Sequence, residues 1–233
     1  LSTTISINAS SRDAVKAAAI ANAVADAYVK NQIATKIDAT NATTDWLNRR
    51  ISDLAQQLQV QQAAIQRYKA ALALDSHLPG LYLNLGLAYF KSKHLPEAAA
   101  AFEEAVKADG GSFQSRALLG MSYYGLARYR EAAAQLKLAS EAQPENLELR
   151  FTLAQSCLWT GQYDEATEQV RFLLTKNPDS APVHVLLGEV LDAAGQTDAA
   201  IAEFEAAVKA PTVPPEAHFG LGYLYWKQQR FED

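Results

Sequence analysis

From Asp45 onward, hydrophobic and small residues recur every thirty-four positions without an insertion or deletion. One column of this frame holds a small residue in every row, namely Gly86, Gly120, Ala154, Gly188 and Gly222. The column before it is leucine throughout, and alanine recurs twelve positions after the glycine. A fixed period of this length is typical of stacked supersecondary units that share one core. The pattern therefore predicts a repeat protein, and it favours a binding scaffold over an enzyme.

Each row of the frame predicts two helices joined by a turn. Leu119, Tyr123 and Leu126 are spaced four and three apart, which is one face of a helix. The second half of the row repeats this spacing around Leu136, with alanine on both sides. The small residues allow two antiparallel helices to approach closely, and a breaker such as Pro144 ends the row. Each row is therefore predicted to be a helix–turn–helix hairpin.

A heptad pattern precedes the rows and overlaps the first of them. Residues alternate at spacings of four and three through Leu47, Ile51, Leu54, Leu58, Gln61, Ile65, Tyr68 and Leu72. All but Gln61 are apolar, which predicts a coiled-coil-like helix over about 45–74, on the order of 45 Å long. The thirty-four-residue frame instead requires a turn near Leu58–Gln61, so a normal hairpin is the alternative. We expect one continuous helix, because that run contains no turn-forming residue.

The first forty residues predict two further elements. Residues 3–8 alternate polar and apolar side chains weakly, which predicts a short strand. A helix is expected over about 11–37, capped by the serines that precede Asp13. The threonine- and asparagine-rich run in 38–45 has poor helix propensity, so the sequence allows a break there without requiring it.

Composition changes sharply between the two parts of the chain. Residues 1–78 contain no glycine, proline or glutamate, and their eight basic residues against six aspartates give +2. The remainder has thirteen basic against twenty acidic residues, giving −7 and together the chain's −5. We therefore expect a helical segment over 1–63 and a repeat array over 64–233. The array would comprise a half repeat, four full repeats and a truncated fifth.

The charge balance and the chain ends bear on function class. No basic stripe is present, which argues against nucleic acid as the main partner. No apolar run approaches the roughly 18 residues that a membrane span needs. The sequence starts at Leu1 without a methionine or signal-peptide pattern and stops within a row, so we expect a fragment of a longer protein.

The columns resemble the tetratricopeptide repeat family over about residues 79–233. The departures are confined to the third and fourth rows, at Ala154, Cys157, Leu191 and Thr197, and affect local packing. The resemblance implies an all-α fold, a right-handed α-solenoid of helix hairpins preceded by the long helical segment. It also implies a non-enzymatic scaffold that binds a protein or peptide.

Residues 1–70 carry a second resemblance, to the periplasmic helical region of bacterial polysaccharide co-polymerases, the chain-length determinants. It rests on Ile5-Ser6-Ile7, the alanine-rich stretch 18–28, the stretch 42–54 and Gln66-Arg67-Tyr68-Lys69. The family's usual Asp-Pro is replaced here by Asp13-Ala14. The resemblance implies a role in export or chain length of surface polysaccharides, on the periplasmic side of the inner membrane. A cytoplasmic location is the alternative.

Residues for catalysis or metal binding are nearly absent. His184 and His218 share one column with Arg116 and Arg150, which predicts a polar or packed ladder rather than a metal site. Cys157 occupies a packing column, so a buried structural thiol is expected. No catalytic residue, metal ligand or cofactor is predicted.

A binding surface is predicted on the side of the first helices that faces away from the second helices. It gathers Phe90, Tyr124, Phe151, Trp159, Phe219, Tyr223 and Trp226, with Glu189 and Asp192 between them. Exposed aromatic residues on one face are typical of a peptide-binding groove. The alternative is that neighbouring second helices cover some of these rings. A basic residue of the bound peptide is expected to meet Asp192.

Three function classes remain open at this point. The first is a protein-interaction scaffold that binds a peptide or helix in the groove. The second is an envelope scaffold for polysaccharide chain-length control, and the third is an artificial fusion in which the repeats carry a long helix. Self-association through residues 10–60 is also expected, because exposed heptads of this length tend to pair.

Overall fold

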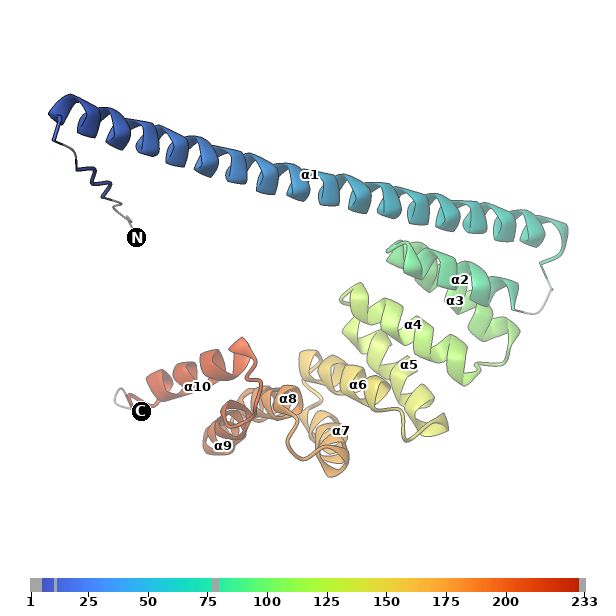
Figure 1. Ribbon diagram of the computed structural model, residues 1–233. Helices are drawn as coiled ribbons and strands as arrows, with labels where there is room; N and C mark the ends of the chain where they lie inside the picture. Colours follow the sequence, from blue (N-terminus) through green and yellow to red (C-terminus); the bar gives the residue numbers. More distant parts are fainter. Residues whose placement is uncertain (1–5, 11, 77–79, 231–233) are drawn as a thin grey trace. The chain divides into compact units, whose positions relative to one another are not determined.

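The computed structural model describes residues 6–10, 12–76 and 80–230, and over these residues all regular secondary structure is helical (Figure 1). The helices are α1 (Ala14–Leu74), α2 (Leu81–Lys91), α3 (Leu95–Ala108), α4 (Phe113–Gly125), α5 (Tyr129–Ala142), α6 (Leu147–Trp159), α7 (Tyr163–Lys176), α8 (Ala181–Ala193), α9 (Thr197–Val208) and α10 (Pro215–Lys227). The chain divides into two compact units, Leu1–Gln59 and Val60–Asp233. The sequence placed this division after residue 63.

Helix α1 is continuous where the sequence left two alternatives. It passes through Leu58–Gln61 without interruption, so the predicted continuity of the helix at this point is confirmed. It also passes through 38–45, and the two helices expected over 11–37 and 45–74 are therefore one. The threonine hydroxyls of this run donate hydrogen bonds of 2.8–2.9 Å to carbonyls four residues earlier. Their polar groups are thus satisfied inside the helix, which offsets their poor propensity.

The helix begins slightly later than the sequence predicted. Asp13 takes the N-cap position in place of the two serines, and its carboxylate accepts hydrogen bonds from the amides of Val15 and Lys16 at 3.0 and 3.4 Å. Of the strand predicted over 3–8, residues 6–8 have no regular secondary structure. Residues 3–5 lie outside the described residues.

The last turns of α1 take the place of a second helix in a half repeat. Ile65 is buried, and the Ser92 hydroxyl donates a 2.9 Å hydrogen bond to the Gln61 side chain. The Lys69 ammonium lies over the Tyr89 ring, 5.6 Å from its centre. Two later rows pair a second helix with the tyrosine twenty residues on, through hydrogen bonds from Tyr123 to Glu103 at 2.7 Å and from Tyr225 to Glu205 at 2.8 Å.

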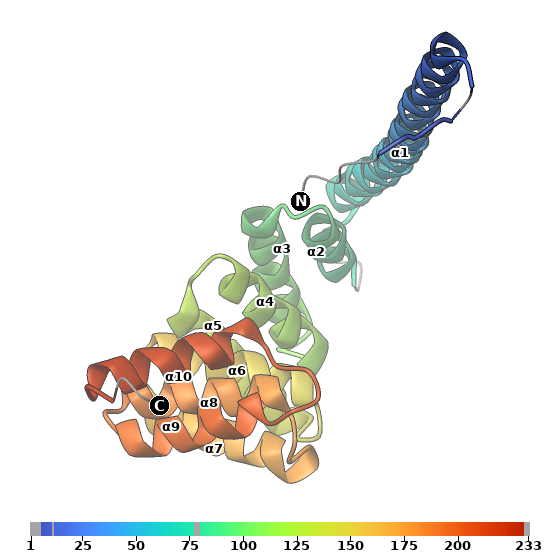
Figure 2. The same ribbon diagram turned by 60° about the vertical axis from the view of Figure 1, so that its left-hand side comes forward.

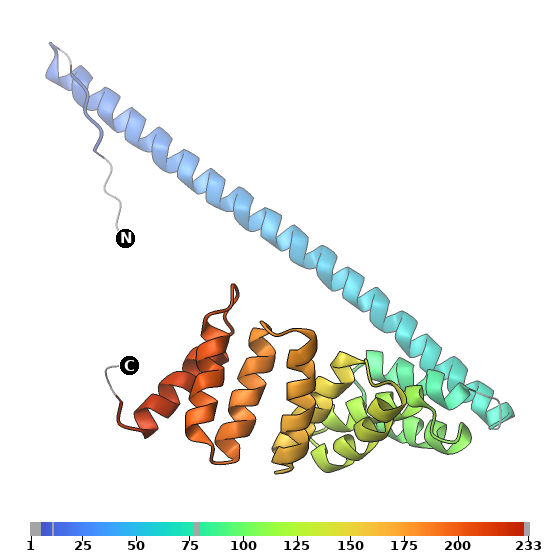
Figure 3. The same cartoon turned by 90° about the horizontal axis from the view of Figure 1, so that it is seen from below.

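The remaining helices form four hairpins and the first helix of a fifth. Each hairpin pairs a first helix (α2, α4, α6 or α8) with a second helix (α3, α5, α7 or α9), and the hairpins follow one another in chain order (Figure 3). The first helices α6, α8 and α10 lie side by side, each in contact with the next (Figure 2). The fold is the predicted α-solenoid.

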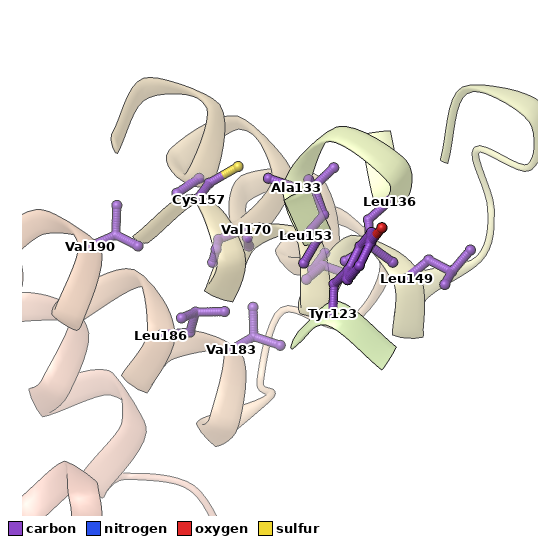
Figure 4. Packing of buried hydrophobic residues seen from close by; sticks show 14 of the residues in the cluster. Tyr123, Ala133, Leu136, Leu149, Leu153, Cys157, Val170, Val183, Leu186 and Val190 are labelled. Atoms are coloured by element: carbon purple, nitrogen blue, oxygen red, sulfur yellow. The ribbon is translucent and has the colours of Figure 1, made fainter. Parts of the chain in front are cut away.

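The glycine column sets the close approach of the two helices in a hairpin. A Cβ added at Gly86 would lie 2.5 Å from the Phe102 ring, and one at Gly120 would lie 2.6 Å from the Leu136 side chain. A Cβ at either position would therefore require the facing side chain of the second helix to shift. Around these contacts the core is continuous from hairpin to hairpin, and Figure 4 shows how Leu136, Leu153 and Val170 fill it. Each hairpin is thus stabilised by its neighbours.

Candidate binding surface on the first helices

The first-helix face is the side of α2, α4, α6, α8 and α10 opposite their packing against the second helices. The seven predicted aromatic residues all lie on first helices: Phe90, Tyr124, Phe151, Trp159, Phe219, Tyr223 and Trp226. The Phe90 ring, however, meets the Phe102 ring of the second helix α3, with ring centres 6.5 Å apart. The helical period predicts the division of each first helix, because the leucine, glycine and tyrosine columns turn toward the second helix and leave other positions on the opposite side.

The seven aromatic residues differ in exposure. Trp159 and Trp226 are each 65% exposed, and Phe219 and Tyr223 are exposed as well. Phe90, Tyr124 and Phe151 are half-buried against the core, as the alternative interpretation of this face expected for some of the rings. Two tryptophans with most of their surface exposed mark this face as a candidate interaction surface.

The aromatic residues form two clusters rather than one continuous band. In the middle of the array, Tyr129 stacks on Trp159 with ring centres 5.5 Å apart, and Tyr124 meets Tyr129 edge-on at 5.6 Å. At the other end, Tyr223 and Trp226 lie 6.2 Å apart on α10. The first cluster, Tyr124–Tyr129–Trp159, combines residues from α4, α5 and α6. It therefore crosses from one hairpin to the next.

Tyr129 was not predicted as part of this surface. It begins the second helix α5 and occupies a column that elsewhere contains Leu95, Tyr163 and Thr197, so the sequence favoured a packing role. The structure shows that its ring stacks on Trp159 while remaining half-buried. The aromatic character of Tyr129 beside an exposed tryptophan was the available signal, but the contact crosses thirty residues of chain.

The two acidic residues of the face, Asp192 and Glu189, differ in their ion pairing. Asp192 forms an ion pair with Lys227 at 3.0 Å, so its predicted role toward a bound basic residue is filled from within the chain. Glu189 has no such partner within the described part of the chain. Although its side chain remains open to solvent, desolvation raises the pKa of the Glu189 carboxyl, and the nearby Glu216 carboxylate adds to this effect.

The predicted ladder of Arg116, Arg150 and His184 is structural. Each side chain contacts a carbonyl of the loop before its helix and a side chain of the following second helix; Arg116, for example, donates to the Gly111 carbonyl at 2.8 Å. The second-helix partners are Gln135, Gln169 and Glu203. The ladder therefore fastens each loop to its hairpin, while His218 is exposed on α10.

Cys157 is the buried structural thiol that its column predicted. Its side chain is 1% exposed, and burial raises the pKa of the thiol to about 11, far from the reactive range. In the described ranges, no three His, Cys, Asp or Glu side chains are grouped so that they could hold a metal ion.

Family models of the tetratricopeptide repeat match the chain over most of its second unit. The matched residues are 57–93, 79–112, 123–171, 158–214 and 185–233. The chain carries tetratricopeptide repeats. The first match begins inside α1, in agreement with its last turns acting as the second helix of a half repeat.

Solved tetratricopeptide structures share this fold. MamA residues 41-end from Desulfovibrio magneticus RS-1 is 18% identical with a TM-score of 0.60, and the match covers 66% of this chain and 87% of that one. YrrB, described as a TPR protein with an unusual peptide-binding site, is 20% identical with a TM-score of 0.59, covering 72% and 87%. A structure of MamA MSR-1 C2 is 23% identical at a TM-score of 0.56, covering 65% and 87%.

The comparisons do not test the resemblance predicted for residues 1–70. No curated protein matches the chain. The resemblance of residues 1–70 to polysaccharide co-polymerases, with the envelope location that it implies, stays a prediction. Among the described helices, none is long and apolar enough to cross a membrane.

Proposed function

We propose that the chain is a protein-interaction scaffold that binds a peptide or helix along its first-helix face. The observation that carries this proposal is the pair of exposed tryptophans, Trp159 and Trp226, at two places along one side of the array. An array of hairpins presents such a side as an extended surface, which suits an elongated ligand. The fold shared with YrrB supports the proposal, since that protein is described as having a peptide-binding site.

Large aromatic side chains supply most of the expected binding energy. Trp159 is already held by the Tyr129 ring, so it loses little conformational freedom when a ligand covers it. The Tyr223 ring lies beside Trp226 on the same helix, with ring centres 6.2 Å apart. Each tryptophan should therefore contribute about 2 kcal/mol or more to affinity, as anchor residues of this type do in protein interfaces.

The test is a random-peptide library selected on the full chain, followed by titration of the selected peptides. We expect Trp159→Ala and Trp226→Ala to weaken binding by about thirtyfold or more, the equivalent of about 2 kcal/mol. Leu138→Ala is the matched control, because Leu138 is an exposed apolar residue of the second helix α5, away from the first-helix face. Peptides that bind both tryptophan variants as tightly as the parent chain would refute the proposal.

We also propose that the chain associates with a second copy through the heptad part of α1. Leu47, Ile51, Leu54 and Leu58 continue one heptad seam, and each is at least 46% exposed. The same seam is covered further on, where Ile65 enters the core of the repeat array. A period of three and four favours another helix as the covering element, because knobs-into-holes packing repeats at this spacing.

A further inference from the structure

The exposed part of the heptad seam on α1 is long enough to form a coiled-coil core. It runs from Ile33 to Leu58 in alternating steps of four and three, and it lies wholly in the unit Leu1–Gln59. The large apolar side chains along it are each at least 46% exposed. Beyond Leu58 the repeat array covers the seam, since Ile65 is buried there. The uncovered seam therefore ends where the array begins.

The residue types along the seam indicate the number of strands. In a heptad the step from an a position to the next d position is three residues, so Ile37, Thr44 and Ile51 are a residues, whereas Leu47 and Leu54 are d residues. The three a residues are β-branched, and the two d residues are leucine. In parallel coiled coils this distribution favours two strands over three or four.

Two threonines in the seam distinguish a parallel from an antiparallel pair. Thr40 is a d residue and Thr44 an a residue, and their hydroxyls donate hydrogen bonds of 2.8 and 2.9 Å to the carbonyls four residues earlier. Each hydroxyl oxygen also has acceptor lone pairs, and a second hydroxyl that rotates toward it can donate to it. In a parallel, aligned pair, each threonine faces the same threonine of the second copy and finds such a donor there.

The antiparallel pair that covers the same seam combines the threonines with apolar residues. There Thr40 faces Ile51 and Thr44 faces Leu47, and neither of these side chains has a polar group. A covered hydroxyl without a polar neighbour is less favourable than one beside a second hydroxyl. The threonines therefore favour the parallel direction.

The charged residues beside the seam are compatible with the parallel direction. Lys36 and Arg50 each precede an a residue, and in a parallel pair such a residue lies near the residue five positions further along the second copy. These neighbours are Asn41 and Ala55. The parallel pair therefore brings no like charges together across the seam.

We propose that α1 forms a parallel, two-stranded coiled coil with α1 of a second copy over residues 33–58. Both repeat arrays then begin at the same end of the coiled coil, because each array follows the C-terminal end of the seam. One dimer carries two first-helix faces, so a surface that displays several copies of the bound peptide is held by both arrays at once. The inference rests on the proposed self-association and adds to it the number and the direction of the strands.

Distances between spin labels, measured by double electron–electron resonance, test the direction. Thr35→Cys and Gln56→Cys place labels at exposed positions twenty-one residues apart, on the side of α1 opposite the seam. In the parallel pair each labelled variant should give a distance of about 20–30 Å, the width of two packed helices. In the antiparallel pair each would give about 40 Å, because twenty-one residues add an axial offset of about 32 Å.

A mixture of the two labelled variants is the matched control. In the parallel arrangement the mixed dimers should add the distance of about 40 Å, whereas in the antiparallel arrangement they would add the distance of about 20–30 Å. The Cys157 thiol is buried, with 1% of the residue exposed, so the parent chain treated with the same reagent should give no signal.

Sedimentation of the labelled chains gives the number of strands. The expected result is a dimer in which both single-label variants give the short distance. An oligomer with the long distance in each variant, or with the mass of three or four chains, refutes the parallel dimer and leaves self-association standing. A chain that stays monomeric at every concentration refutes both, and it leaves the binding of peptides by the repeats unaffected.

Discussion

The turn that follows each first helix contains one residue with a left-handed backbone. This position recurs every thirty-four residues, with φ of 62° at Lys93, 57° at Ala127, 74° at Gly161, 79° at Gly195 and 60° at Gln229. Glycine adopts this conformation without strain, whereas a residue with a Cβ does not. Three of the five turns are therefore strained at one residue, and the neighbouring helices hold them in place.

Exchanging glycine and alanine at this position should change stability in opposite directions. We expect Ala127→Gly to raise the free energy of unfolding by about 0.5–1 kcal/mol, because strain at φ 57° is relieved. Gly161→Ala should lower it by about 1 kcal/mol, since an added Cβ there meets only the Tyr163 hydroxyl at 4.0 Å and the cost is conformational. Urea denaturation midpoints measure both.

A control substitution at an exposed helical alanine shows the change in the free energy of unfolding that Ala→Gly causes without a left-handed backbone. Ala134→Gly on α5 should destabilise the array by about 1 kcal/mol, as glycine does within helices. If Ala127→Gly destabilised the chain as much as Ala134→Gly does, the left-handed turn would not be a source of strain.

At the scale of single elements, α1 combines two roles in one uninterrupted helix. Its last turns bury Ile65 in the repeat core, while its earlier turns keep the heptad seam exposed. The helix continues across the junction because residues 58–61 contain neither glycine nor proline. The boundary between the two units therefore falls within α1.

A proline at the junction tests this continuity. Gln59→Pro should reduce the free energy of local helix opening by about 3 kcal/mol, because proline removes a hydrogen bond and clashes with the preceding turn. Hydrogen exchange of the amides around residues 55–63 measures the change, and Gln59→Ala serves as the control. Unchanged protection in the proline variant would contradict a continuous helix at this point.

For the whole molecule, the exposed seam of α1 decides the expected state of association. An apolar seam of this length is costly to leave in water, and pairing with a second copy removes it. In the half repeat the same seam is covered, since Ile65 is buried there and Tyr68 and Leu72 pack against the core. We therefore expect association to be a property of the N-terminal unit and peptide binding a property of the repeats.

Sedimentation of three chains tests this division. The parent chain should sediment as an oligomer at high concentration, and Ile51→Glu with Leu54→Glu should make it monomeric, because charged residues at heptad core positions prevent pairing. Gln56→Glu adds charge on the opposite side of the helix and should leave the oligomer intact. A parent chain that stays monomeric at every concentration would contradict self-association.

Much of the architecture could be predicted from the sequence, because each repeat shows the same pattern of packing residues. The glycine, leucine and alanine columns predicted the hairpins, the buried face of each helix and the buried thiol of Cys157, since identical local packing recurs in every row. The heptad seam predicted the long helix through Leu58–Gln61 for a similar reason. The break that the sequence allowed in 38–45 is absent, because helix propensity takes no account of threonine hydroxyls that donate hydrogen bonds back to the helix.

The sequence by itself determined the repeat fold, its packing columns and the aromatic character of the first-helix face, because each depends on a spacing within one row. Only the tertiary structure decided which side chains meet across rows. It joined Tyr129 to Trp159, engaged Asp192 with Lys227 thirty-five residues away, and left Glu189 as the carboxylate without a counter-charge in the described face. These contacts depend on the angle and offset between successive hairpins, which a one-dimensional period does not specify.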